Sequence, residues 1–127
     1  EKARDFRCAR LPNETGGVIL GHFDTHSKIC SIVDILPSPP DSQEWPMSYI
    51  RGCEGLSKQV QDIGERTLGQ IGYVGEWHSH PDNCSVMPSG DDMQAYGWLD
   101  ANMRAEGLPA IMLIIGEKEQ WSFVAKT

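Results

Sequence analysis

The order of hydrophobic and polar positions along this chain separates β-rich runs from segments with a helical period. Apolar and β-branched residues predict strands at 18–25, 29–36, 71–80 and 121–125. A uniformly apolar run at 110–115 is typical of a strand buried in the middle of a sheet. Helical character predicts helices at 1–10, 56–68 and 90–106. Strands interspersed with helices indicate an α/β fold.

A proline-rich stretch interrupts this pattern in the first half of the chain. The segment 37–46, PSPPDSQEWP, carries four prolines, and we expect an extended surface loop there. Because the segments on either side are too short to form a core alone, the loop is not a domain boundary. We therefore expect one domain over residues 1–127. The chain begins with Glu1 and not with methionine, which is compatible with excision from a longer protein.

Composition and charge narrow the classes of function. Eighteen acidic residues against eleven basic ones give a net charge of -7, which argues against broad nucleic-acid binding. No apolar run approaches the roughly 20 residues that a membrane-spanning helix needs, and no signal peptide is visible. The four cysteines are far apart and form no CxxC pair, so we expect reduced thiols in a cytoplasmic protein.

The most informative pattern pairs two histidines with an acidic helix start. His78 and His80 alternate in a predicted strand, so their side chains share a face about 6 to 7 Å apart and could bind one metal. A carboxylate from the following helix would complete a His, His, Asp set that keeps one position for water. Taken alone, the two histidines also suit a plain surface, and Ser89 with Asp92 suits a capping box.

These residues together resemble a known signature. His78-Ser79-His80-Pro81, followed by Pro88-Ser89-Gly90-Asp91-Asp92, is similar to the HxHP and SxxD motifs of the JAMM metalloproteases. The upstream segment ETGGVILG, which begins at Glu14, is similar to the glycine-rich strand that follows the family's glutamate. The resemblance covers about 14–116. It implies a JAB/MPN-type, cytidine-deaminase-like fold in which helices sandwich the sheet.

The resemblance also implies a role for each motif residue. It makes His78, His80 and Asp92 the ligands of one Zn²⁺ per chain, Glu14 the general base, and Ser89 a hydroxyl that stabilises the oxyanion. The gap from His80 is one residue longer than the commonest family spacing, which would end on Asp91. If Asp91 were the ligand, the role of Ser89 would also change. A His, His, Asp set suits iron or manganese as well as zinc.

Three other residues carry side chains that are capable of chemistry. Glu76 shares the strand face of the histidines and is the alternative base. Cys84 is close in sequence, but a thiolate nucleophile needs a histidine partner, and both nearby histidines are better used on metal. The sequence around Arg51 reads as the entry to a helix, without chemistry.

The function implied by the resemblance is a zinc isopeptidase. It would hydrolyse the bond after the C-terminal glycine of a ubiquitin-like protein, for deconjugation or precursor processing. The subgroup it resembles is bacterial and linked to ubiquitin-like conjugation, with activating and conjugating enzyme homologues as partners, sometimes fused and sometimes in antiviral (antiphage) defence. The alternatives are a non-catalytic MPN scaffold and a metal hydrolase acting on a sulfur-carrier protein or small molecule.

Overall fold

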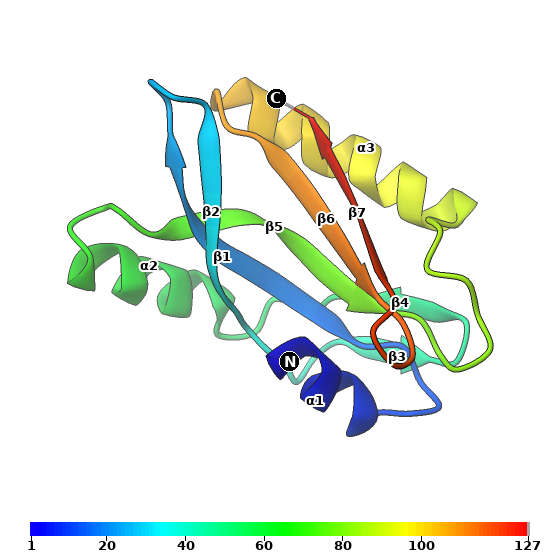
Figure 1. Cartoon of the computed structure of the whole chain (residues 1–127). Helices are drawn as coiled ribbons and strands as arrows, with labels where there is room; N and C mark the ends of the chain where they lie inside the picture. The colour runs from blue at the N-terminus through cyan, green and yellow to red at the C-terminus, as the bar shows by residue number, and fades with distance from the viewer. Residues whose placement is uncertain (127) are drawn as a thin grey trace.

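A curled, mixed sheet forms the centre of the computed structural model, which describes residues 1–126 (Figure 1). Its five strands run in the order β2-β1-β5-β6-β7. Their bounds are β1 Gly16–Asp24, β2 Ile29–Ile35, β5 Gly72–Ser79, β6 Ala110–Ile115 and β7 Trp121–Lys126. β5 and β6 are parallel, and the other neighbours are antiparallel. The predicted central strand at 110–115 is therefore confirmed as β6.

Helix α1 (Lys2–Cys8) covers one face of this sheet. Ala3 packs in a buried cluster with Trp77 and Ile111, which point to that face from β5 and β6. Phe6 stacks on the Trp77 ring with 5.9 Å between the ring centroids. Trp77 is 1% exposed and thus serves as core on this face of the sheet.

Helices α2 (Leu56–Arg66) and α3 (Gly90–Ala105) cover the other face. Leu56 of α2 packs on Val18 of β1, while Tyr96 of α3 packs on Met112 of β6. Strand register places Val18, Glu76 and Met112 side by side across β1, β5 and β6. The two helices therefore flank the middle strand, β5, and leave part of this face between them. The predicted α/β fold, with a sheet between helices, is confirmed.

The prediction of an extended loop at 37–46 was wrong in part. β3 (Gln43–Trp45) begins inside it and pairs antiparallel with β4 (Ser48–Ile50), which the pattern did not predict. Pro46 stands in the tight turn of this hairpin, where a missing N–H costs no ladder hydrogen bond. The other prolines precede β3. Figure 1 shows the hairpin beside the ends of β5 and β6.

The remaining predicted helices and strands agree with the structure to within a few residues at their ends. None of the helices within residues 1–126 has the length and apolar character to cross a membrane.

Candidate metal centre

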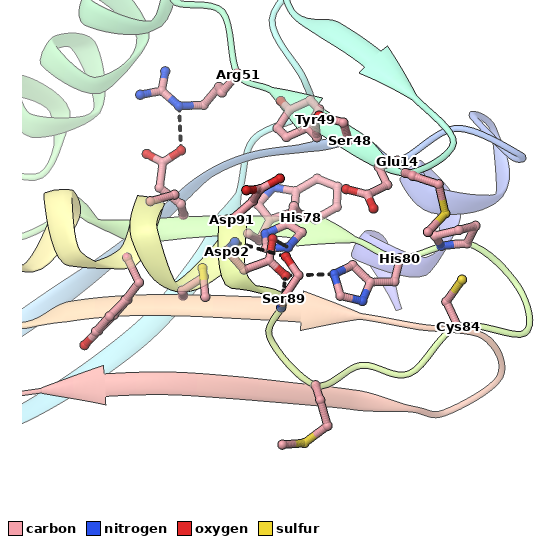
Figure 2. Close-up of a pocket in the computed structure, with 18 of the residues that line it drawn as sticks. Glu14, Ser48, Tyr49, Arg51, His78, His80, Cys84, Ser89, Asp91 and Asp92 are labelled. Atoms are coloured by element: carbon pink, nitrogen blue, oxygen red, sulfur yellow. Dashed lines mark hydrogen bonds and ion pairs between the residues drawn. The ribbon is translucent and has the colours of Figure 1, made fainter.

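The side chains of His78 in β5, of His80 just after this strand and of Asp92 in α3 meet at one point beside the sheet (Figure 2). Nε2 of His78 lies 3.0 Å from Oδ1 of Asp92, and Nε2 of His80 lies 3.0 Å from Oδ2 of the same carboxylate. The potential ligand atoms of the three residues all lie within 4.8 Å of one another. Asp92 thus lies between both imidazoles, and the three ligand atoms are close enough to share one metal ion.

Local structure explains this convergence. His78 and His80 alternate at the end of β5, and their ring centroids are 5.3 Å apart. Asp92 lies in the first turn of α3, where Ser89 is the N-cap. The Ser89 Oγ accepts from the Asp92 N–H at 3.0 Å, and the Ser89 N–H donates to Asp92 Oδ2 at 2.9 Å. The capping box is therefore present, and it orients the same carboxylate that faces the histidines.

The electrostatics of the centre favour an anionic carboxylate. Burial by itself would raise the pKa of Asp92, but the imidazoles of His78 and His80 outweigh it and hold this pKa well below its usual range. The pKa of His80 is raised, first by its hydrogen bond with Asp92 and against the effect of burial. A charged carboxylate between two imidazoles is a donor set for a divalent cation.

A buried nitrogen supports the fit of a metal. Among the residues that the structure describes, none offers His78 Nε2 a hydrogen bond of good geometry, although the atom is buried. Burying a polar nitrogen without a well-aligned hydrogen bond costs free energy. Two imidazole nitrogens and one carboxylate oxygen form a catalytic zinc set with an open fourth position. The residues present therefore fit a divalent metal ion such as zinc.

The second histidine has a partner on its other ring nitrogen. Nδ1 of His80 donates to the carbonyl oxygen of Ser85 at 2.6 Å, in the loop that follows β5. Such a bond fixes the tautomer and turns the lone pair of Nε2 toward the metal position.

Glu14 lines the same cavity, just before β1 (Figure 2). It is only 8 % exposed, and burial raises its pKa, against the opposing effect of His78 and His80. Its backbone N–H donates to the Trp45 carbonyl of the hairpin at 2.9 Å. The next residue, Thr15, donates its N–H to the Ser79 Oγ at 2.9 Å. The hairpin and β5 together hold this carboxylate beside the histidines.

A glycine makes room for the hairpin at this point. Gly16 pairs with His78 across β1 and β5. A Cβ built at Gly16 would lie 2.6 Å from the Tyr49 ring and would also meet the Trp77 carbonyl oxygen. The glycine after Glu14-Thr15 thus allows the hairpin to close over the site.

The cavity has a volume of about 460 Å³ and extends from the histidines along β5 to Glu76 and Arg51. Its lining combines the acidic and histidine side chains with apolar residues of the hairpin, α3 and β6: Met47, Tyr49, Tyr96, Leu99 and Met112. A cavity with apolar walls and a few converging polar groups is typical of a ligand site.

Asp91 also lines the cavity, but it is not in the cluster of three potential ligands. Both carboxylate oxygens of Asp92 face the imidazoles instead. The geometry thus favours the longer of the two spacings considered above.

Glu76, the alternative base, is already paired with other side chains, and both ring nitrogens of His80 are engaged, so neither is free to activate Cys84. Glu76 pairs with Arg51 at 2.5 Å and accepts a hydrogen bond from the Tyr73 hydroxyl, so both its oxygens are occupied. Burial raises the pKa of Glu76 despite this arginine. Cys84 lines the cavity, but the two ring nitrogens of His80 already face Ser85 and Asp92.

Sequence reasoning missed Arg51 as part of this cavity. Its guanidinium lies in the wall and its partner Glu76 is 25 residues away in the sequence. The one signal in the sequence was Glu76, a charged residue on the inner face of a predicted strand. A carboxylate that is partly buried there needs a cationic partner.

The sequence is similar to a known protein family and to several named bacterial proteins. Residues 1–125 match the family described as prokaryotic homologs of the JAB domain. A protein of Enterobacter hormaechei named CD-NTase/cGAS isopeptidase is 36% identical over 104 residues, which cover 82% of this chain and 56% of that protein. An Escherichia coli protein of the same name is 34% identical over 109 residues, covering 85% and 65%.

A more distant relative is a probable metalloprotease of Sinorhizobium fredii, 24% identical over 110 residues, which cover 85% of this chain and 66% of that protein. The chain thus spans between half and two thirds of the length of these relatives.

Proposed function

Since this chain belongs to the family of prokaryotic JAB-domain homologues, we propose that it is a zinc-dependent isopeptidase that cuts after the C-terminal glycine of a ubiquitin-like protein. One observation carries the proposal: Asp92 meets both histidines at 3.0 Å in a cavity that also holds Glu14. The relatives named isopeptidase and metalloprotease support hydrolysis as the reaction class.

Zinc would be held by His78, His80 and Asp92. When bound, it supplies Lewis acidity that polarises a carbonyl oxygen and strengthens water as a nucleophile near neutral pH. The scaffold alternative is not supported, because such domains usually lack some of these ligands and this chain carries all three.

Glu14 is the proposed general base. Its carboxylate would take a proton from the attacking water and deliver it to the leaving amine. The raised pKa that burial gives this group suits proton transfer near neutral pH, because it narrows the gap to the working pH. No protein nucleophile takes part, so no acyl-enzyme forms.

Ser89 is the proposed oxyanion donor. Its Oγ accepts the N–H of Asp92, which leaves its own O–H proton free to donate toward the cavity. A positioned donor of this kind stabilises a tetrahedral oxyanion by about 2.7–4 kcal/mol.

Membership of this family and the word isopeptidase in the relatives' names support the proposed substrate class. An extended tail that ends in glycine can lie along an open cavity and place its last carbonyl at the metal. The names of the relatives suggest conjugates of a nucleotidyltransferase of the CD-NTase/cGAS type as targets. We propose a cytoplasmic enzyme that works beside activating and conjugating enzyme homologues, in deconjugation or precursor trimming and within antiviral defence.

The test begins with zinc content. We expect about one zinc per chain by elemental analysis of protein purified without added metal, retained in Asp91→Ala and lost in Asp92→Ala. Loss in Asp91→Ala alone would shift the ligand set and remove the basis for Ser89. The absence of zinc from all three proteins would contradict the proposed function.

The second step is a cleavage panel. Ubiquitin-like proteins joined to a reporter protein through a peptide or an isopeptide bond are compared with reporters that carry the tail of a sulfur-carrier protein. Each substrate is tested with and without a metal chelator. Chelator-sensitive release of a glycine-ended ubiquitin-like protein is the expected result. Selective cleavage of carrier tails would favour the alternative substrate.

A further inference from the structure

Arg7 is a buried charged side chain that lies outside the cavity and has no role in the chemistry described above. It comes from α1, is only 4 % exposed, and reaches the segment that follows β5. Its Nε donates to the carbonyl oxygen of His80 at 3.0 Å, and its Nη2 lies 2.5 Å from Oδ1 of Asp82. We infer that Arg7 is a positioning residue that holds His80 in its zinc-binding orientation, an inference that rests on the proposed function.

The first argument is that the sheet ends where Arg7 binds. The β5–β6 ladder closes with Ser79 opposite Ile115, and the His80 N–H makes one last bond to the Ile115 carbonyl at 2.9 Å. The His80 carbonyl lies beyond the last paired residue of β5, and Pro81 has no N–H to continue a ladder. A buried carbonyl needs a donor, and Arg7 supplies it.

The second argument concerns the loop around the imidazole. Arg7 binds on both sides of Pro81, at His80 and at Asp82, and so fixes the direction in which the chain leaves the strand. Three residues later, the Ser85 carbonyl accepts the Nδ1 proton of His80. The arginine therefore fixes the start of the loop that orients this ring.

The third argument is that α1 has other means of docking. Ala3 lies in the core cluster, and Phe6 stacks on Trp77. Burying a guanidinium costs several kcal/mol before pairing, so it is a poor way to attach a helix that apolar residues already hold. What Arg7 adds is a connection to the histidine segment.

The experiment measures zinc affinity by competition with a chelator on the full chain, for wild type, Arg7→Gln, Arg7→Lys and Asp82→Ala. The matched control is Lys2→Gln, which removes another ion pair of the same helix, an exposed one with Asp34. The thermal unfolding of each metal-free protein is recorded alongside. Absorption of the cobalt(II)-substituted proteins reports the coordination geometry independently of activity.

We expect Arg7→Gln to weaken zinc binding about 10- to 100-fold, as loss of a group that supports a metal ligand commonly does. Arg7→Lys should recover part of the affinity, Asp82→Ala should show a smaller loss, and Lys2→Gln should match wild type. The cobalt spectrum should change in Arg7→Gln and not in Lys2→Gln.

A lower unfolding temperature in Arg7→Gln, with zinc affinity and cobalt spectrum unchanged, would overturn the inference and leave Arg7 a helix anchor. If Arg7→Gln does not fold, Asp82→Ala decides, because its side chain is 54 % exposed and can be removed without opening the core. Wild-type affinity in that variant would then overturn the inference alone. Failure of the wild-type chain itself to bind zinc would overturn the proposed function and this inference together.

Discussion

The two histidines of the metal centre are held by different parts of the molecule, although only one residue separates them. His78 lies inside the sheet, paired with Gly16 of β1 on one side and Ile114 of β6 on the other. His80 lies just past the sheet and depends on side-chain and loop contacts with Arg7 and Ser85. Backbone ladders fix the first ring, whereas the distant Arg7 side chain and the loop that follows β5 fix the second.

This difference teaches where the centre is tolerant and where it is vulnerable. A strand with neighbours on both sides keeps its position when one side chain changes, because the ladder hydrogen bonds remain. A residue beyond the ladder loses its position with its few partners. Asp92, which spans both rings from the start of α3, couples the two halves.

The largest effect on kcat is expected from a change that removes the proposed general base and leaves the supports of both histidines intact. Glu14→Gln should lower kcat by about 100- to 10,000-fold, because a neutral amide cannot accept the water proton. Zinc content and affinity should stay at the wild-type level, since this side chain is not one of the three ligands. Steady-state cleavage and elemental analysis measure the two quantities, and loss of zinc in this variant would contradict the assignment of Glu14 as base.

A smaller effect on kcat is expected at Ser89, which caps α3 and orients Asp92. Ser89→Ala should lower kcat by about 100- to 1,000-fold through loss of an oxyanion donor, and should lower the free energy of unfolding by about 1 kcal/mol through loss of the helix cap. Chemical denaturation and kinetics separate the two.

The control for this variant is Ser85→Ala. The Ser85 hydroxyl accepts only from the Met87 N–H among the described residues, and its carbonyl, which binds His80, is kept. If Ser85→Ala reduced kcat as much as Ser89→Ala, the special role of Ser89 would be refuted.

The support that the sheet gives to His78 can be tested at Gly16, which pairs with His78 across β1 and β5. Gly16→Ala should lower the free energy of unfolding by about 1–3 kcal/mol, the usual cost of overpacking. The new Cβ would press on the Tyr49 ring and on the Trp77 carbonyl beside His78. Urea unfolding measures the change, and a wild-type stability would show that the hairpin does not pack as described.

The smallest effect, of opposite sign, is expected at a second glycine. Gly97 lies within α3, where an added Cβ meets nothing within 4 Å. Gly97→Ala should therefore raise the free energy of unfolding by about 0.5–1 kcal/mol through helix propensity, without changing zinc affinity. Destabilisation by Gly97→Ala would show that an added methyl group destabilises this protein even where it meets no atom. The loss of stability in Gly16→Ala could then not be assigned to its clash.

Much of the site was predictable because its parts are local. The alternation of His78 and His80 follows from strand geometry, and the position of Asp92 in the first helical turn follows from the capping pattern with Ser89. Glu14 was identified only by resemblance, because a lone acid in a loop carries no local signal. The structure then placed it in the same cavity as the histidines.

The hairpin and the two arginines were not predictable in the same way. Four prolines in 37–46 masked β3, because proline content indicates a loop although Pro46 occupies only the turn. Arg51 meets a partner 25 residues away, and Arg7 meets one 73 residues away. Nothing near either arginine in the sequence distinguishes it from a surface residue.

By itself, the sequence determined the helices, the strands of the main sheet, the α/β class and the residues able to form a metal centre, because period, caps and motif spacing act over a few residues. Only the tertiary structure decided which carboxylate meets both imidazoles, what holds His80 beyond the sheet, and how the hairpin closes the cavity. Those contacts join segments far apart along the chain, and they exist only once the helices have packed on the two faces of the sheet.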